Sequence, residues 1–446
     1  MRISTSQIYN AGVLGIERNQ NSLYKLQNQL SSGRRILTPE DDPVGAAQAL
    51  VLTQSQEVNA QQVNNQGNAS DQLGSIDTQL SALTDVLQSV RSKVVQAGST
   101  ATLSNSDRQV LANDLDSSLS QMLGIANSKN SSGDYLFSGY QGATLPFAIN
   151  ASTAAVPPAS TSPVGYFGDD GQRLLQVSPS RQMGVNVAGS DLFMNVKEGN
   201  GTFAVATGGN TAGGNNQGAA TADAGSVLDQ QKWQAALNNF GWSTSASPAL
   251  QIRFSVAAGV SSYQLFDVSN PATPVAISSA APYTPGQAIP LASTNPPAAT
   301  VTDFGSQLVV QGQPANNDTF TVQPSSSQSL FQTMQSLIGI LRSPVGSASY
   351  SATEYSNALA GQMTNLDNAL ANVSRVQSSV GSRLSELDSL GTTSSDLDIQ
   401  YQASLSKIQG LDYTQAASDF TQQQTNLQAA QKSFVQIAGL SLFNYL

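Results

Sequence analysis

Apolar residues recur at alternating steps of three and four over residues 73–97, a spacing that places them on one face of a helix. A sustained repeat of this kind is typical of a coiled coil, in which a narrow apolar stripe is buried against a partner helix. A second amphipathic helix is predicted over about 106–129. The repeat consists of Leu73, Ile76, Leu80, Leu83, Leu87, Val90, Val94 and Ala97.

The C-terminal third carries a matching repeat, in which Leu359, Leu366, Val373, Val380 and Leu387 stand seven apart. Each of the two segments has one apolar stripe, and the simplest way to bury both stripes is to pack the helices side by side. The sequence therefore predicts an antiparallel coiled-coil rod built from both ends of the chain.

Two further heptad seams lie at the extreme ends of the chain. They comprise Tyr9, Ile16, Leu23 and Leu30 near the start and Tyr413, Phe420, Leu427 and Phe434 near the end. One interpretation is that these helices form a single intramolecular coiled coil. The alternative is that helices so rich in Gln, Asn and Ser are marginal alone and become ordered when neighbouring subunits pack around them. We treat these eight residues as candidate assembly residues.

A hinge is predicted between the first seam and the rod. Gly33 suits the end of a helix, and Asp42 followed by Pro43 reads as the N-cap and first residue of the next one. The cluster Glu40-Asp41-Asp42 offers carboxylates for a metal or for acid–base chemistry. However, helix capping and the helix dipole explain acidic residues at this position without a ligand.

The middle of the chain, residues 146–324, is rich in Gly and Pro and contains short alternating runs such as 251–256, which predict strands. The Gly-rich stretch 208–216 lacks the Gly-Lys-Ser/Thr ending of a phosphate-binding loop and reads as a flexible surface loop. Possible sugar-contacting aromatic residues are Tyr166, Phe167, Trp233, Trp242, Tyr263 and Phe266. A carbohydrate-binding or hydrolytic module is thus an alternative for this region.

The predicted fold class is α+β, multidomain and elongated, with a β-rich domain inserted between coiled-coil rods from both chain ends. Residues 1–45 and 400–446 form the inner terminal helices, 46–145 and 325–399 the rod, and 146–324 the inserted domain.

Composition argues against catalysis and against several partners. The 446-residue chain has no cysteine and no histidine, which removes thiolate and imidazole nucleophiles, general bases and metal ligands, so we expect neither an enzyme nor a cofactor or metal site. A net charge of −10 disfavours nucleic acid. No apolar run is long enough to span a membrane, and the N-terminus lacks the pattern of a cleaved signal peptide.

The hinge sequence resembles a family motif. Leu30–Ile36 followed by Asp41–Pro43 is similar to the N-terminal motif of the bacterial flagellin family. Within that family, the opening Met1–Thr5, the stretch Gly133–Gly139 and the ending Gly439–Leu446 resemble the flagellin-like proteins of the hook–filament junction. The resemblance covers roughly residues 1–140 and 330–446.

This resemblance implies a structural subunit that forms a ring between hook and filament, with the chain ends as an inner helical layer and the inserted domain pointing away from the axis. The implied partners are further copies of the chain, a neighbouring hook-associated protein, flagellin, and an export chaperone at the C-terminal helical region. The implied location is the extracellular flagellum, reached without a cleaved signal peptide. A filament-forming flagellin is the alternative within the family.

Overall fold

The computed structural model describes residues 5–99, 103–149, 164–242, 249–294, 303–346 and 350–443. The chain forms two compact units, and each is described here by itself. The first contains Met1–Asn68, Gln176–Arg181 and Leu387–Leu446, and the second contains Ala69–Leu175 and Gln182–Glu386. The helices are α1 (Thr5–Ser32), α2 (Pro43–Ala97), α3 (Asn105–Ala126), α4 (Gln230–Phe240), α5 (Leu330–Arg342), α6 (Ala352–Gln409) and α7 (Tyr413–Phe443), with a π-helical turn η2 (Ser190–Met194).

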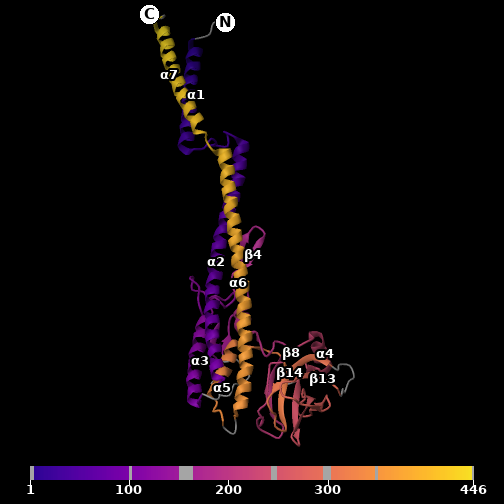
Figure 1. Cartoon of the computed structure of the whole chain (residues 1–446). Coiled ribbons are helices and arrows are strands. Elements are labelled where there is room, and N and C mark those ends of the chain that lie inside the picture. Colours follow the sequence, from indigo (N-terminus) through magenta and orange to yellow (C-terminus); the bar gives the residue numbers. More distant parts are fainter. Residues whose placement is uncertain are drawn as a thin grey trace. The chain divides into compact units, whose positions relative to one another are not determined.

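In the second unit, α2 and α6 lie side by side and bury the predicted apolar stripes (Figure 1). All eight residues of the α2 repeat are at most 1% exposed. Polar contacts fix the direction of the pair: Arg91 Nε donates to Asp367 Oδ1 at 2.7 Å, and Gln377 Nε2 donates to Asp77 Oδ1 at 3.3 Å. Because later residues of α2 meet earlier residues of α6, the helices are antiparallel, as the heptads predict.

Two shorter helices, α3 and α5, pack against each other in the same unit. Ser104 begins α3 with a capping box, in which its side chain accepts the Asp107 N–H and Asp107 in turn accepts the Ser104 N–H. α5 begins at Ser329, whose hydroxyl accepts the Gln332 N–H at 3.0 Å. Local capping chemistry therefore sets where both helices start.

In the described part of the β-rich middle, the strands form a six-stranded and a four-stranded sheet together with three two-stranded ones. The largest sheet has the order β11-β10-β9-β15-β6, with β12 also paired to β10. The strands are β1 (Phe147–Ile149), β2 (Val164–Tyr166), β3 (Leu174–Ser178), β4 (Arg181–Gly184), β5 (Val196–Lys197), β6 (Phe203–Asn210), β7 (Thr221–Ala222), β8 (Ser226–Val227), β9 (Leu250–Ala257), β10 (Val260–Asp267), β11 (Val275–Ala276), β12 (Ala281–Pro282), β13 (Ala288–Ala292), β14 (Asp303–Gln311), β15 (Asp318–Pro324) and β16 (Ser327–Gln328). The α+β fold class is therefore confirmed.

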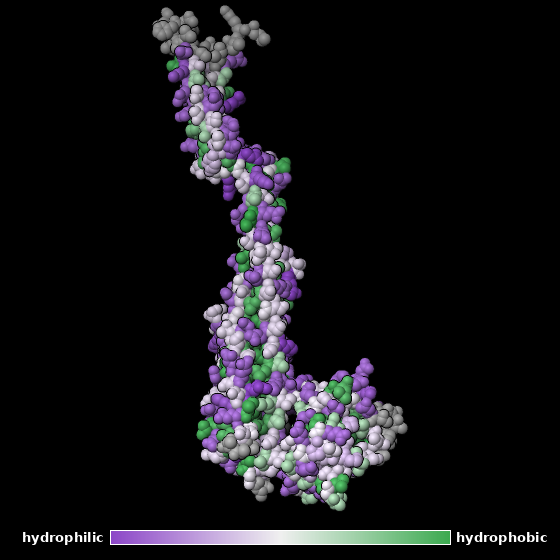
Figure 2. All heavy atoms as spheres, in the orientation of Figure 1, coloured by the Kyte–Doolittle hydropathy of each residue, from purple (hydrophilic) through white to green (hydrophobic). Residues whose placement is uncertain are grey.

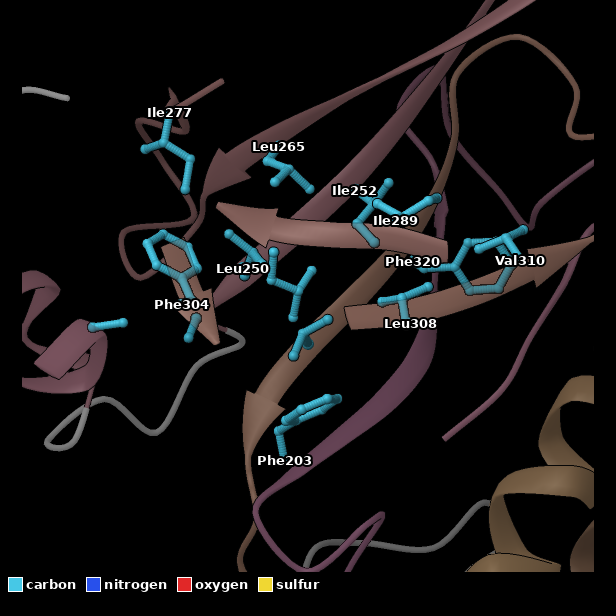
Figure 3. Packing of buried hydrophobic residues seen from close by; sticks show 14 of the residues in the cluster. Phe203, Leu250, Ile252, Leu265, Ile277, Ile289, Phe304, Leu308, Val310 and Phe320 are labelled. Carbon is cyan, nitrogen blue, oxygen red and sulfur yellow. The ribbon is translucent and has the colours of Figure 1, made fainter. Parts of the chain in front are cut away.

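The two larger sheets and α4 enclose a common hydrophobic core (Figure 3). Along β9, Leu250, Ile252 and Phe254 are buried, which is the period of two expected for a strand with one covered face. Trp233 and Trp242 are fully buried in this core, so they serve packing and are not available to contact a sugar. The core cluster contains only residues between 203 and 322, so we refer to this part as the inserted module.

The prediction of a flexible surface loop over 208–216 is wrong for part of that stretch. Gly208 to Asn210 form the end of β6, where Gly209 pairs with Thr319 and Asn210 with Asp318 of β15, and Gly208 lies at a register shift. Asn216 is buried, donates to the Thr319 carbonyl at 2.8 Å and accepts the Thr319 N–H at 3.0 Å. Pairing with a neighbouring strand outweighs the low strand propensity of glycine at this position.

Truncation of a rod core residue tests the packing of α2 against α6. Leu366→Ala removes a fully buried side chain and should lower the free energy of unfolding by about 2–5 kcal/mol. Val95→Ala, at a position 54% exposed, should change it by no more than about 0.5 kcal/mol. Urea unfolding followed by circular dichroism measures both; equal effects would contradict the buried seam.

Candidate assembly surface

The candidate assembly residues lie in the first unit, where α1 and α7 pack along each other (Figure 1). The rings of Tyr9 and Phe434 lie 5.0 Å apart, and Gln423 Nε2 donates to Asn19 Oδ1 at 3.1 Å. A Cβ atom at Gly12 would lie 2.7 Å from the Phe434 ring, so only glycine permits this close approach. The structure thus brings Tyr9 and Phe434, from the two predicted seams, into contact.

The terminal seams are less buried than the rod seam. Six of the eight candidate assembly residues are only partly buried: Ile16, Leu23, Leu30, Phe420, Leu427 and Phe434. Tyr9 and Tyr413 remain 54% and 58% exposed. Much of the apolar surface of α1 and α7 is therefore accessible in the single chain.

The predicted hinge residues occupy the junction between α1 and α2. Gly33 has φ +68° and donates its N–H to the Gln29 carbonyl at 2.8 Å, which ends α1. Helix α2 begins at Pro43, and Asp42 Oδ1 accepts the Gly45 N–H at 2.9 Å. Gly33 is constrained twice, because a Cβ atom there would also lie 2.6 Å from the Tyr413 hydroxyl oxygen.

A second connection, between α6 and α7, is tied to this hinge. The Arg35 N–H donates to the Gln409 carbonyl at 2.7 Å, and the Leu411 N–H donates to the Gly33 carbonyl at 3.1 Å. The Arg35 guanidinium donates to the Ile408 carbonyl at 2.9 Å. Sequence reasoning missed this partner segment. Its pattern was nevertheless visible: Gly410 follows the end of α6 and Asp412 caps the start of α7, as Gly33 and Asp42 do for α1 and α2.

The acidic residues of the hinge are held by hydrogen-bond donors and cations. The Lys25 ammonium, 2.5 Å away, and the N–H groups of Thr38 and Leu37 lower the pKa of Asp41 from 3.8 to about 2. The Gly45 N–H, followed by the Arg35 guanidinium, lowers the pKa of Asp42. Among the residues that the structure describes, no group of three His, Cys, Asp or Glu side chains is arranged to hold a metal ion.

The seam between α2 and α6 changes character in the first unit. The heptad position occupied by Leu73 in the rod is occupied by Gln66 and Asn59 one and two repeats earlier, and both are buried. Asn59 Nδ2 donates to the Ser394 carbonyl at 2.8 Å, and Gln66 Nε2 donates to Ser394 Oγ at 3.2 Å. In this segment, amides occupy seam positions that leucine fills in the rod.

Several large apolar residues of the same α2 segment are exposed, although Ala49 is buried and Leu52 is partly buried. Val44, Val51 and Val58 stand seven apart and are 68%, 62% and 47% exposed, with Leu50 beside them at 70%. We call Val44, Val51 and Val58 the outer valine stripe. More than half of the exposed large apolar side chains in the described ranges lie in the first unit. Figure 2 shows such side chains (green) along the helical surface. We treat the stripe as a candidate interaction surface, because clustered exposed apolar residues are typical of such surfaces.

The sequence analysis did not identify the outer valine stripe. Its seven-residue spacing is present in the sequence, but it is out of phase with the rod seam, so a search that followed the rod seam passes over it. None of the helices in the described ranges is both long enough and apolar enough to cross a membrane.

Two family profiles match the terminal regions of the chain: the bacterial flagellin N-terminal helical region over residues 3–142 and the bacterial flagellin C-terminal helical region over residues 363–446. Together they cover about half of the chain, which belongs to the bacterial flagellin family.

Within this family, the similar proteins include flagellar hook-associated protein 3 from two bacteria. The chain is 25% identical to the flagellar hook-associated protein 3 of Salmonella typhimurium and to that of Escherichia coli, over 99% of both chains in each case. The crystal structure of the flagellar junction protein FlgL from Legionella pneumophila is similar with a TM-score of 0.64 and 26% identity, covering 81% of this chain and 100% of that one. FlgL from Xanthomonas campestris, at 21% identity, a TM-score of 0.61 and coverage of 80% and 99%, shares the fold.

The lowered pKa of Asp41 predicts how the hinge responds to acid. A carboxylate whose folded-state pKa lies below its ordinary value stabilises the fold above about pH 4, and this contribution is lost as pH falls to about 2. The rate of amide hydrogen exchange of residues 33–45, corrected for intrinsic rates, should therefore rise as the pH falls through that interval. Asp41→Asn should remove the part of this pH dependence that is due to Asp41 and leave the part due to Asp42, whose pKa is also lowered. Glu40→Gln, at an exposed neighbour, should keep the whole of it. A wild-type profile in Asp41→Asn would contradict the assignment.

Proposed function

We propose that this protein is a non-enzymatic structural adaptor of the bacterial flagellum that joins hook to filament. Its copies assemble through the first unit. The observation that carries the proposal is made on α2, where the amides of Asn59 and Gln66 are buried in the seam while the outer valine stripe is exposed to solvent. Similarity to hook-associated protein 3 along the full chain supports the adaptor role.

Self-association follows from the energetics of the outer valine stripe. Complete burial of a valine side chain contributes roughly 1.5–3 kcal/mol relative to leaving it in water. Amides in the seam contribute less than the leucines that replace them in the rod, because their hydrogen bonds exchange for bonds to water. Covering the stripe with a neighbouring copy restores the hydrophobic burial that the seam lacks.

The terminal helices α1 and α7 are proposed as the inner assembly layer, comprising residues 1–45 and 400–446. Their partly buried seams, with Tyr9 and Tyr413 mostly exposed, support this role. Limited proteolysis of the purified monomer should trim both ends first and leave a core from near residue 45 to near residue 400. Equal resistance of the ends and of the rod would argue against a separate assembly layer.

The proposal extends to partners and location. A ring of these subunits would contact a neighbouring hook-associated protein on one side and flagellin on the other, with an export chaperone on the C-terminal helical region before assembly. The assembled protein would lie in the extracellular flagellum, and the chain would reach it without a cleaved signal peptide. The names of the similar proteins support the flagellar location.

A filament-forming flagellin is the second candidate, because the family profiles of the two ends describe flagellins. Seeded polymerisation separates the two functions. Purified flagellin extends filament seeds to great length, whereas an adaptor should add a limited number of copies and stop. Continued growth from seeds by this protein would favour the flagellin alternative.

Substitution in the outer valine stripe tests the assembly surface. The double variant Val51→Asp/Val58→Asp introduces charge at positions that are exposed in the single chain, so the monomer should remain folded by circular dichroism. Burial of those charges against a neighbouring copy is costly, so co-sedimentation with isolated hooks should fall at least tenfold. The matched control Gln54→Asp/Gln61→Asp adds the same charge at exposed polar positions of α2 and should bind normally. Normal binding of the valine variant would refute the stripe's role.

A further inference from the structure

Helix α6 has a second functional face within the second unit, beside the apolar face that packs on α2. Polar and small residues recur along it at steps of three and four, which places them in one row on the helix. The row comprises Glu354, Asn357, Gly361, Asn365, Asn368 and Asn372. We call its four asparagines the amide ladder.

The first two asparagines of the ladder hold segments that flank the module's sheets. Asn357 Oδ1 accepts the Ala222 N–H at 3.1 Å, while its Nδ2 donates to the Ala220 carbonyl at 3.1 Å. Asn365 Oδ1 accepts the Gly199 N–H at 2.9 Å. Each contact pairs a side-chain amide of the rod with a main-chain group of the inserted region.

The last two asparagines repeat this chemistry further along α6. Asn368 Nδ2 donates to the carbonyls of Lys197 at 2.8 Å and Gly199 at 2.6 Å. Asn372 Nδ2 donates to the carbonyls of Asp191 at 2.9 Å and Leu192 at 3.1 Å. Since every partner of these bonds is a main-chain group, the ladder recognises the course of the backbone and not the identity of the side chains.

The contact surface around the ladder is hollow. A groove of about 370 Å³ separates α6 from β6 and is lined by Asn357, Gly361 and Asn365 on the helix side. A Cβ atom at Gly361 would meet no atom within 4 Å. Among the described residues, no residue of α6 belongs to the module's hydrophobic core, so the module does not need α6 to bury these apolar side chains.

The side-chain contacts at the two ends of the row differ in strength. Arg375 pairs with Asp191 at 3.2 Å, but both side chains are more than half exposed, and such pairs contribute little. At the other end, Asn215 Nδ2 donates to Glu354 Oε2 at 2.6 Å, and Glu354 is buried. This bond and the main-chain bonds of the ladder together constrain orientation along this face.

We propose that the amide ladder of α6 is a mounting surface that sets the orientation of the inserted module on the rod. Asn357 binds the backbone of the module itself at Ala220 and Ala222, and the other three asparagines bind the backbone of residues 191–199, which lead into the module. The module folds around its own core, and the ladder only holds it in place. The segments bound by the ladder, residues 191–199 and 220–222, are the mounted segments. Their side chains can therefore change without a change in the orientation of the module. This role does not depend on the flagellar assignment.

The chain is suited to a direct test because it contains no cysteine and only two tryptophans. Spin labels at Val95→Cys on α2 and Val260→Cys on β10, both exposed, report the distance between rod and module in the full-length protein. Trp233 and Trp242 both lie in the module core, so tryptophan emission reports module folding separately.

In the variant Asn357→Ala/Asn365→Ala/Asn368→Ala/Asn372→Ala, the interspin distance distribution should broaden at least twofold, with unchanged tryptophan emission. The control Ser374→Ala/Ser378→Ala/Ser382→Ala, on exposed positions of α6, should keep the original distribution. An unchanged distribution in the asparagine variant would overturn the proposal. A shift in tryptophan emission would overturn it too, because the ladder would then be part of module folding.

A second variant tests whether recognition is limited to the backbone. Asp191→Ala/Lys197→Ala removes two side chains from the mounted segments and keeps the carbonyls that the ladder binds. The distance distribution should remain as narrow as that of the parent protein. Broadening equal to that of the asparagine variant would show that side chains set the orientation and would overturn backbone recognition.

Discussion

The antiparallel pairing of α2 with α6 is the interaction on which the rest of the structure depends. It joins segments from opposite ends of the sequence, and the Tyr355 hydroxyl closes the pair by donating to the Ala97 carbonyl at 2.8 Å. The end of α2 therefore lies against the start of α6. The inserted module lies between α3 and α5 in the sequence, and these two helices pack against each other in the same unit. A module with its own core can thus be carried between paired helices.

The residues in the seam of this helix pair differ along its length, and different faces of α6 make different contacts. Leucines fill the seam in the rod, whereas Asn59 and Gln66 fill it near the hinge, where the outer valine stripe faces water. On α6, apolar residues such as Leu366 face α2 while asparagines such as Asn368 hold the inserted module. Hydrophobic burial stabilises the helix pair, whereas the polar contacts fix the orientation of the segments that they join.

The features predicted from sequence are those with a local or periodic cause. Heptad spacing gave the rods, and capping preferences located the hinge at Gly33 and Asp42. Helix α4 was missed because it is short and lies in a region where glycine and proline dominate. The amide ladder and the outer valine stripe were missed for a different reason: asparagines carry no hydrophobic signal, and whether a valine faces a partner helix or solvent depends on the tertiary pairing. Strand pairing likewise ordered Gly208 to Asn210 against their local propensity.

The function proposed for this protein is attachment of the filament to the hook through its first unit. Electron microscopy of flagella from cells that lack the protein tests this function most directly. We expect completed hooks that carry no filaments, with flagellin released into the medium, and recovery of filaments when the intact chain is restored. Filaments of normal length attached to hooks in the absence of the protein would contradict it.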